Sequence, residues 1–139
     1  MEDPYNLQRF EDAQGPVIEQ VLRELRAGRK NSHWMWFIFP QLRGLGRSPM
    51  AVKHAIVSRE EAEAYLRHEV LGPRLRECTR LVNLVEGKSV SEIFGYPDDL
   101  KFHSSMTLFA SVASGEKIFS DALDKYFGGE LDPRTMEEL

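Results

Sequence analysis

Helix start and stop signals follow one another at short intervals along the chain, and this pattern constrains the fold most strongly. Ser58 to Glu61 and Ser89 to Glu92 each place a serine three residues before a glutamate, which is the arrangement of a capping box. Gly15-Pro16 and Gly128-Gly129 end the helical patterns that precede them. Paired strand patterns are nearly absent, because apolar and polar residues rarely alternate. The sequence therefore predicts an all-α fold, a compact bundle of short helices.

The size and composition of the chain fit one such domain. The chain has 139 residues, of which 42% are apolar and 29% are charged. A chain of this length buries roughly two thirds of its unfolded surface, so it folds without a metal ion or a disulfide. We expect a single helical domain over residues 1–139, in which residues 129–139 form a C-terminal tail that can fray.

Several features bear on the location and assembly of the protein. Its single cysteine, Cys78, excludes an intrachain disulfide and fits a reducing compartment. The first ten residues lack the apolar centre of a signal peptide. The longest apolar run, residues 34–40, is far shorter than the ~20 residues that span a bilayer. We expect a cytoplasmic monomer or weak homodimer without membrane association, and a buried Cys78 on a helix face with Leu75 and Val82.

The segment from Trp34 to Phe39 is apolar at every position and contains both tryptophans of the chain. Periodicity alone does not distinguish a buried strand from a buried short helix in a run of this length. Ser32 is a good N-cap and no partner strand is visible elsewhere, which favours a helix. The strand remains the alternative.

A loop with two glycines and two arginines follows this segment. Gly44 and Gly46 let backbone N–H groups approach a ligand, and Arg47 can pair with a phosphate or a carboxylate. Ser48 precedes a proline as the N-cap of a further helix, whose first N–H groups also favour anions. An exposed turn beside a core aromatic cluster would give the same pattern. The expected ligand-binding residues here are Trp34, Trp36, Gln41, Gly44, Gly46, Arg47 and Ser48.

The helical pattern that starts near Asp98 carries polar residues in the wrong place for a simple core helix. On a helical projection Lys101, Ser104 and Ser105 lie within or beside the apolar face. Each serine can bond to the carbonyl four residues earlier, and Lys101 can reach solvent or pair with Asp98. The functional interpretation is that these three residues line a pocket and that Lys101 binds an anion there.

No residue stands out as catalytic. His33 and Asp98 are the candidates for a general base, and hydrolysis at a glycosidic or phosphate-linked centre would be the reaction class. Metal-ligand spacing among histidine, cysteine and acidic residues is absent from the sequence, so we expect no metal and no cofactor.

Beyond these individual signals, a set of motifs resembles the uncharacterised bacterial domain-of-unknown-function family 1810. The resemblance runs from about Asp3 to Asp132 and rests on His33 to Gln41 with Gly44-Leu45-Gly46 and Ser48, on Arg9-Phe10, Glu61-Ala62, Leu71-Gly72 and Phe94-Gly95, and on Lys101 with Ser104 to Phe109. The resemblance implies a compact, mainly helical domain without an established activity. The family is sometimes labelled calpastatin-like, which implies protease inhibition, but this chain has no disordered inhibitory repeat.

Three functional hypotheses follow. The leading one is a domain that binds or hydrolyses a small anionic, nucleotide-like metabolite between the two segments. A fainter similarity of Lys101-Phe102 to a helical family linked to ADP-ribose and riboflavin-pathway glycosidic chemistry implies the same ligand class. The alternative is a protein-interaction module without catalytic activity, favoured if Trp34 or Trp36 lies exposed. Nucleic-acid contact is the weakest hypothesis, because it depends on one basic helix end, Arg23, Arg26, Arg29 and Lys30.

Overall fold

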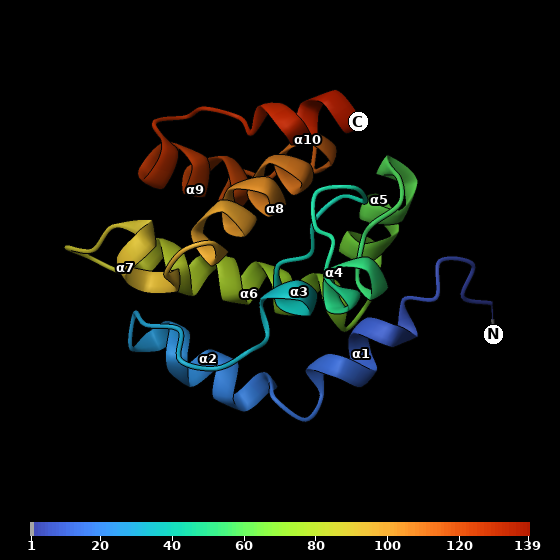
Figure 1. Cartoon of the computed structure of the whole chain (residues 1–139), viewed down its shortest axis with the longest axis horizontal. Helices are drawn as coiled ribbons and strands as arrows, with labels where there is room; N and C mark the ends of the chain where they lie inside the picture. Colours follow the sequence, from blue (N-terminus) through green and yellow to red (C-terminus); the bar gives the residue numbers. More distant parts are fainter. Residues whose placement is uncertain (1) are drawn as a thin grey trace.

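Helices account for the regular secondary structure of residues 2–139, the part of the chain that the computed structural model describes (Figure 1). In chain order they are α1 (Gln8–Gln14), α2 (Ile18–Arg26), α3 (Met35–Ile38), α4 (Pro49–Lys53), α5 (Arg59–Arg67), α6 (Leu71–Leu84), α7 (Val90–Phe94), α8 (Asp98–Val112), α9 (Ile118–Phe127) and α10 (Pro133–Glu138). Extended pairing within this part is limited to one isolated parallel bridge between Leu42 and Ile56. The all-α prediction is confirmed.

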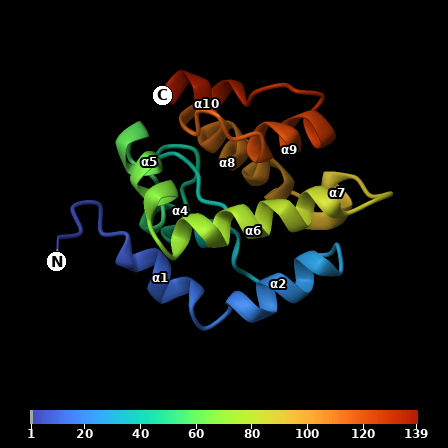
Figure 2. The same cartoon turned by 180° about the vertical axis from the view of Figure 1, so that it is seen from behind.

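Helix α6 runs through the middle of the molecule. Helices α1 and α2 lie on one side of it and α8, α9 and α10 on the other, as both views show (Figures 1 and 2). Leu71, Leu75 and Cys78 of α6 are all at most 1% exposed, so one face of the central helix is buried in the core. Burial raises the pKa of the Cys78 thiol to about 12. The expected burial of Cys78 is confirmed.

Helix caps form at four positions that the sequence marks. The side chains of Ser48, Ser58, Ser89 and Asp132 accept hydrogen bonds from the backbone N–H groups of Ala51, Glu61, Glu92 and Thr135. Ser89 and Glu92 form the complete reciprocal capping box. In the other predicted box the Glu61 carboxylate accepts from the N–H of Val57 instead. Local side-chain chemistry therefore fixes where several of the short helices begin.

The Trp34–Phe39 segment forms a single helical turn in the core. Helix α3 covers its four central residues, which resolves the open choice in favour of helix. The expected Ser32 cap is wrong, because Trp34 holds the N-cap position and the Ser32 hydroxyl donates to Glu24. Phe39 is fully buried and meets the rings of Phe94 and Phe102 edge-on, at centroid distances of 5.8 and 5.0 Å. The aromatic run therefore joins the N-terminal half of the chain to α7 and α8.

The C-terminal residues pack against the body of the domain. Helix α10 contacts α8, and its Thr135 is fully buried. Fraying of residues 129–139 concerns motion and stays a prediction. Within residues 2–139, no helix combines the length and the apolar character needed to cross a bilayer.

Candidate functional site

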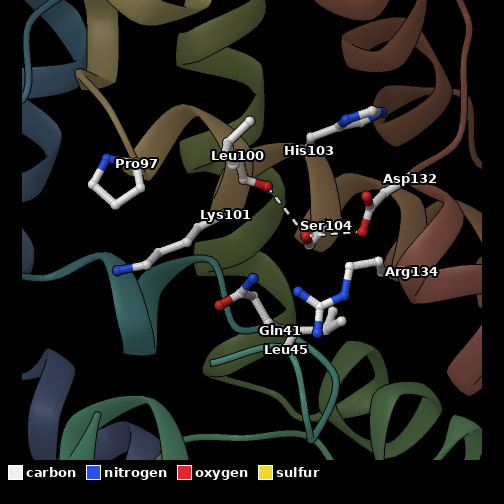
Figure 3. Close-up of a pocket in the computed structure, with 9 residues that line it drawn as sticks. All are labelled: Gln41, Leu45, Pro97, Leu100, Lys101, His103, Ser104, Asp132 and Arg134. Atoms are coloured by element: carbon white, nitrogen blue, oxygen red, sulfur yellow. Dashed lines mark hydrogen bonds between the residues drawn. The ribbon is translucent and has the colours of Figure 1, made fainter. Parts of the chain in front are cut away.

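A cavity of about 340 Å³ lies where three distant parts of the chain meet (Figure 3). The loop before α4 forms one wall, the first turns of α8 form the second, and the segment that enters α10 forms the third. The lining residues are Gln41, Leu45, Pro97, Leu100, Lys101, His103, Ser104, Asp132 and Arg134. The two unusual segments of the sequence therefore do meet at one cavity, through Gln41 and Leu45 on one side and Lys101 and Ser104 on the other.

The α8 wall places Lys101 and Ser104 at adjacent positions on one helix face. The Ser104 hydroxyl oxygen lies 3.1 Å from the carbonyl oxygen of Leu100 and 3.1 Å from Oδ2 of Asp132. Its single proton can serve either acceptor. The serine thus makes the local helix bond that the sequence allows, and it also faces the cavity.

Lys101 lines the cavity with its side chain but directs its ammonium group toward Asp98 and Trp36, neither of which is a lining residue. Its Nζ lies 3.4 Å from Oδ1 of Asp98, but Oδ2 of the same carboxylate is only 2.8 Å from Nζ of Lys30. One aspartate is therefore shared by two lysines. Lys101 Nζ also lies 5.4 Å from the centroid of the Trp36 ring, whose face attracts a cation weakly.

Asp132 connects the C-terminal segment to α8 through one of its two carboxylate oxygens. Oδ2 accepts hydrogen bonds from Ser104 and from the backbone N–H and hydroxyl of Thr135. The backbone N–H of Asp132 donates to Oγ1 of Thr107 at 2.9 Å. Oδ1 makes no hydrogen bond within residues 2–139, so this cavity-lining carboxylate retains a free acceptor.

Arg134 brings a second cation to the cavity. Its guanidinium group forms no ion pair with any residue between 2 and 139, and its one hydrogen bond is a long one, 3.5 Å from Nη2 to the carbonyl oxygen of Gly44. Figure 3 shows Arg134 and Gln41 facing the same space. Most of the donors of this guanidinium are free for a ligand.

His103 holds the third wall in place. Its Nε2 lies 2.7 Å from the carbonyl oxygen of Glu130, so this nitrogen carries the proton and donates it. Its ring stacks on Phe127 with centroids 4.0 Å apart and an interplanar angle of 7°. Both contacts tie α8 to the segment that carries Asp132 and Arg134.

Several expected binding residues lie away from the cavity lining. Trp34 is 1% exposed, and its indole N–H donates to Oε1 of Glu24 at 3.0 Å, so it is a core residue and does not wall the cavity. Trp36 lies beside Lys101 without lining the cavity. Ser48 caps α4. The remaining members of this group are Gly46, Arg47 and Ser105.

Gly44 and the two candidate bases also stand apart. Gly44 contributes only its carbonyl oxygen, which faces Arg134. His33 is exposed and does not line the cavity. Asp98 is neutralised by Lys30 and Lys101. The geometry therefore offers neither His33 nor Asp98 as a base directed at a bound molecule.

Arg134, Asp132 and His103 are the polar lining residues that the sequence did not indicate as ligand contacts, and the apolar ones are Leu45, Pro97 and Leu100. Asp132 precedes a proline, which is typical of a helix N-cap, but no sequence signal shows that this cap faces Ser104. Within the described chain no three histidine, cysteine or acidic side chains group in a way that could hold a metal ion. The arrangement provides cationic donors and a few acceptors, which suits binding.

With this geometry in place, comparison with known proteins defines the family. A family model described as a protein of unknown function (DUF1810) matches residues 4–139, so the chain belongs to that family. The chain is similar to the conserved hypothetical protein Rv1873 from Mycobacterium tuberculosis, whose crystal structure is known. The two are 60% identical over 99% of this chain and 98% of that chain, with a TM-score of 0.97. No protein of curated function matches the chain.

Proposed function

We propose that this protein binds a small anionic metabolite in the cavity between Gln41, α8 and α10. The observation that carries the proposal is that two cationic side chains from distant parts of the chain line one cavity. Arg134 has no ion-pair partner in residues 2–139, and the ammonium group of Lys101, now beside Asp98, can turn toward the cavity by a change of rotamer. The formal charges of the lining residues, Lys101 and Arg134 against Asp132, leave one net positive charge at the cavity, which favours an anion.

The walls of the cavity strengthen this attraction. Leu45, Pro97 and Leu100 line it with apolar surface. A ligand that displaces water there meets the cations in a medium of lower dielectric constant, where charge-assisted hydrogen bonds are stronger. The volume of about 340 Å³ also lies within the range of roughly 300–1,000 Å³ that is typical of metabolite pockets.

The structure supports binding better than catalysis. A hydrolase needs a base or a nucleophile directed at the bound molecule. His103 donates to the Glu130 carbonyl oxygen, and Asp132 serves as a helix cap. The protein-interaction alternative depends on an exposed Trp34 or Trp36, whereas Trp34 is buried and Trp36 is partly buried against the core, so neither tryptophan supports it.

Binding of inorganic phosphate to matched variants tests the proposal. Arg134→Met and Lys101→Met should each weaken phosphate binding about tenfold, the effect of one charge-assisted contact at a partly desolvated site. Arg47→Met is the control, because Arg47 is an exposed arginine of the loop before α4 and does not line the cavity. Isothermal titration calorimetry at constant ionic strength gives the dissociation constants. Equal affinities for all three variants and the parent chain would refute the proposal.

A further inference from the structure

The cavity offers hydrogen-bond acceptors as well as cations, and this mixture narrows the ligand class. The side-chain amide of Gln41 makes no hydrogen bond within the described chain, so its oxygen and its nitrogen are both unused. Oδ1 of Asp132 is likewise an unused acceptor. A simple anion can satisfy Lys101 and Arg134, but it leaves these two acceptor oxygens without a proton donor.

We infer that the ligand is a polyhydroxylated anion. Its phosphate or carboxylate group pairs with Arg134 and is joined there by Lys101, which turns from Asp98 by a change of side-chain rotamer. Its hydroxyl groups donate to Oδ1 of Asp132 and Oε1 of Gln41. Sugar phosphates and polyhydroxy carboxylates share this chemistry. The inference rests on the proposed function, since it names the ligand of the same cavity.

The charge of Asp132 favours a ligand that carries hydroxyl groups beside its anionic group. A bare dianion near Arg134 would meet the Asp132 carboxylate with nothing between two negative groups. A hydroxyl group solves this, because its proton is donated to the carboxylate while its carbon skeleton separates the two charges. The C–H faces of such a skeleton would lie against the apolar side chains of Leu45, Pro97 and Leu100.

The same cavity is poorly suited to a nucleobase. His103 is the one aromatic side chain in the described lining, and one face of its ring already stacks on Phe127. Trp34 is buried in the core, and Trp36 does not line the cavity. A base would therefore gain little of the stacking energy that aromatic platforms supply.

Affinity measurements with four probes test the inference on the full chain. Inorganic phosphate supplies the anion alone, glucose 6-phosphate and gluconate add hydroxyl groups to a phosphate and to a carboxylate, and adenosine 5′-monophosphate adds a base. Glucose 6-phosphate, gluconate or both should bind at least about tenfold more tightly than phosphate and than adenosine monophosphate, the gain expected from hydrogen bonds to a charged acceptor. The preferred member of the pair identifies the anionic group.

The variant Asp132→Asn tests the role of Oδ1 as an acceptor for the ligand while it keeps the helix cap that Asp132 forms. Asparagine is a good N-cap, so its amide oxygen can continue to accept from Thr135 while its nitrogen replaces Oδ1 as a donor. This variant should weaken binding of the hydroxylated probe about tenfold and leave phosphate binding unchanged or tighter. Gln41→Leu should weaken the hydroxylated probe in the same selective way, and it touches no cap. Circular dichroism and the melting temperature report whether each variant folds.

The outcomes distinguish the two proposals. If phosphate binds in an Arg134-dependent manner but hydroxyl groups add no affinity, the polyhydroxylated ligand is wrong and the anion site stands. If adenosine monophosphate binds most tightly, or if both acceptor variants weaken all probes equally, the inference is overturned. If no probe binds, both the inference and the proposed function fail.

Discussion

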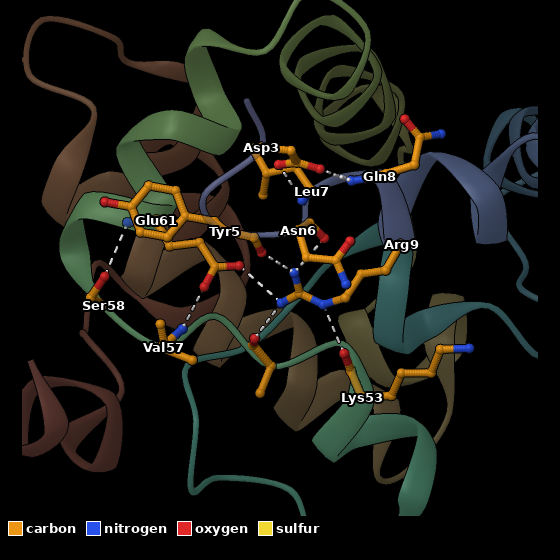
Figure 4. A network of polar contacts seen from close by, with 11 residues as sticks. Asp3, Tyr5, Asn6, Leu7, Gln8, Arg9, Lys53, Val57, Ser58 and Glu61 are labelled. Carbon is orange, nitrogen blue, oxygen red and sulfur yellow. Dashed lines mark hydrogen bonds and ion pairs between the residues drawn. The ribbon is translucent and has the colours of Figure 1, made fainter. Parts of the chain in front are cut away.

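Arg9 and Arg134 are the same residue type in two opposite situations. The guanidinium group of Arg9 donates five hydrogen bonds, all between 2.6 and 2.9 Å (Figure 4). The acceptors are the carbonyl oxygens of Lys53, Tyr5, Asn6 and Ala55 and the carboxylate of Glu61. Arg134 makes one long bond and no ion pair within residues 2–139.

The carboxylates of Glu24 and Asp132 also differ in how much of their hydrogen-bonding capacity the chain uses. The oxygens of Glu24 accept hydrogen bonds from both backbone and side-chain donors: Gln20, the N–H groups of Asn31 and Ser32, the Ser32 hydroxyl and the Trp34 indole. Burial raises the pKa of Glu24, but these hydrogen bonds, first that of Ser32, outweigh it and lower the pKa to about 2. Asp132 leaves one oxygen unused at the cavity.

The contrast separates charges that hold the fold from charges that remain available. A charged group whose hydrogen-bonding capacity is used within the chain fixes one arrangement of the backbone. A charged group at a cavity with unused capacity contributes little to the fold and can bind something else.

The same substitution at the two arginines should give very different losses of stability. Arg9→Met removes five hydrogen bonds and leaves the Glu61 carboxylate, which is 1% exposed, without its cation. We expect the free energy of unfolding to fall by about 3–5 kcal/mol, the usual cost of breaking a buried ion pair. Arg134→Met should change it by less than about 0.5 kcal/mol, as at ordinary surface sites. Urea denaturation measures the unfolding free energy of both variants. Similar losses for the two would show that Arg9 and Arg134 do not differ in their contribution to the fold.

Glu24 should give the domain a stability that depends on acid pH. Its folded pKa is about 2 against an ordinary value of 4.5, so its ionised form stabilises the fold above pH 4.5 and this contribution is lost as the pH falls through 2. The lost contribution is on the order of 3 kcal/mol. The difference in unfolding free energy between the parent chain and Glu24→Gln should therefore shrink between about pH 6 and pH 2. A difference that is independent of pH would contradict this role.

Cys78 can report whether each arginine substitution opens the core. Because its thiol is buried and its pKa is raised, labelling by a thiol reagent requires an opening of the native state. Arg9→Met should speed labelling markedly, whereas Arg134→Met should leave the rate at that of the parent chain. Equal rates in the native and the urea-unfolded parent chain would show that Cys78 is accessible after all.

The smallest effect is expected at the contact between Lys101 and Trp36. Lys101→Met should lower the unfolding free energy by less than about 1 kcal/mol, because a partly exposed cation–π contact contributes little. It should nevertheless change the tryptophan emission, since the charge 5.4 Å from the ring is removed. Trp36→Phe in both backgrounds is the control. Emission that still responds to Lys101→Met without Trp36 would exclude this contact as the source.

The fold was largely predictable because its signals are local. Ser48, Ser58 and Ser89 each accept from an N–H group three residues further along, so the sequence contains the whole interaction. Cys78 was placed correctly because its neighbours on the helix face are apolar. Such short-range chemistry does not depend on how the helices are arranged.

The candidate site was only half predictable, because its residues meet through tertiary packing. Lys101 and Ser104 were recognisable as polar residues beside an apolar face. Arg134 reaches the cavity only because Asp132 bonds to Ser104 and Thr107 on α8. The indole of Trp34 was expected at a ligand, but its partner is Glu24, a residue whose burial the amphipathic pattern of α2 did not reveal.

The bridge between Leu42 and Ile56 has a consequence for chain length. The N–H of Arg43 donates to the carbonyl oxygen of Ile56 at 2.7 Å, and the N–H of Ile56 donates to that of Gln41 at 2.9 Å. These two bonds hold the two ends of the segment between Arg43 and Ile56 next to each other. Extra residues inserted between Arg47 and Ser48, both exposed, would add only loop-closure entropy, about 0.6 kcal/mol for each doubling of the loop. Homologous chains can therefore differ in length at this point while Gln41 keeps its place at the cavity.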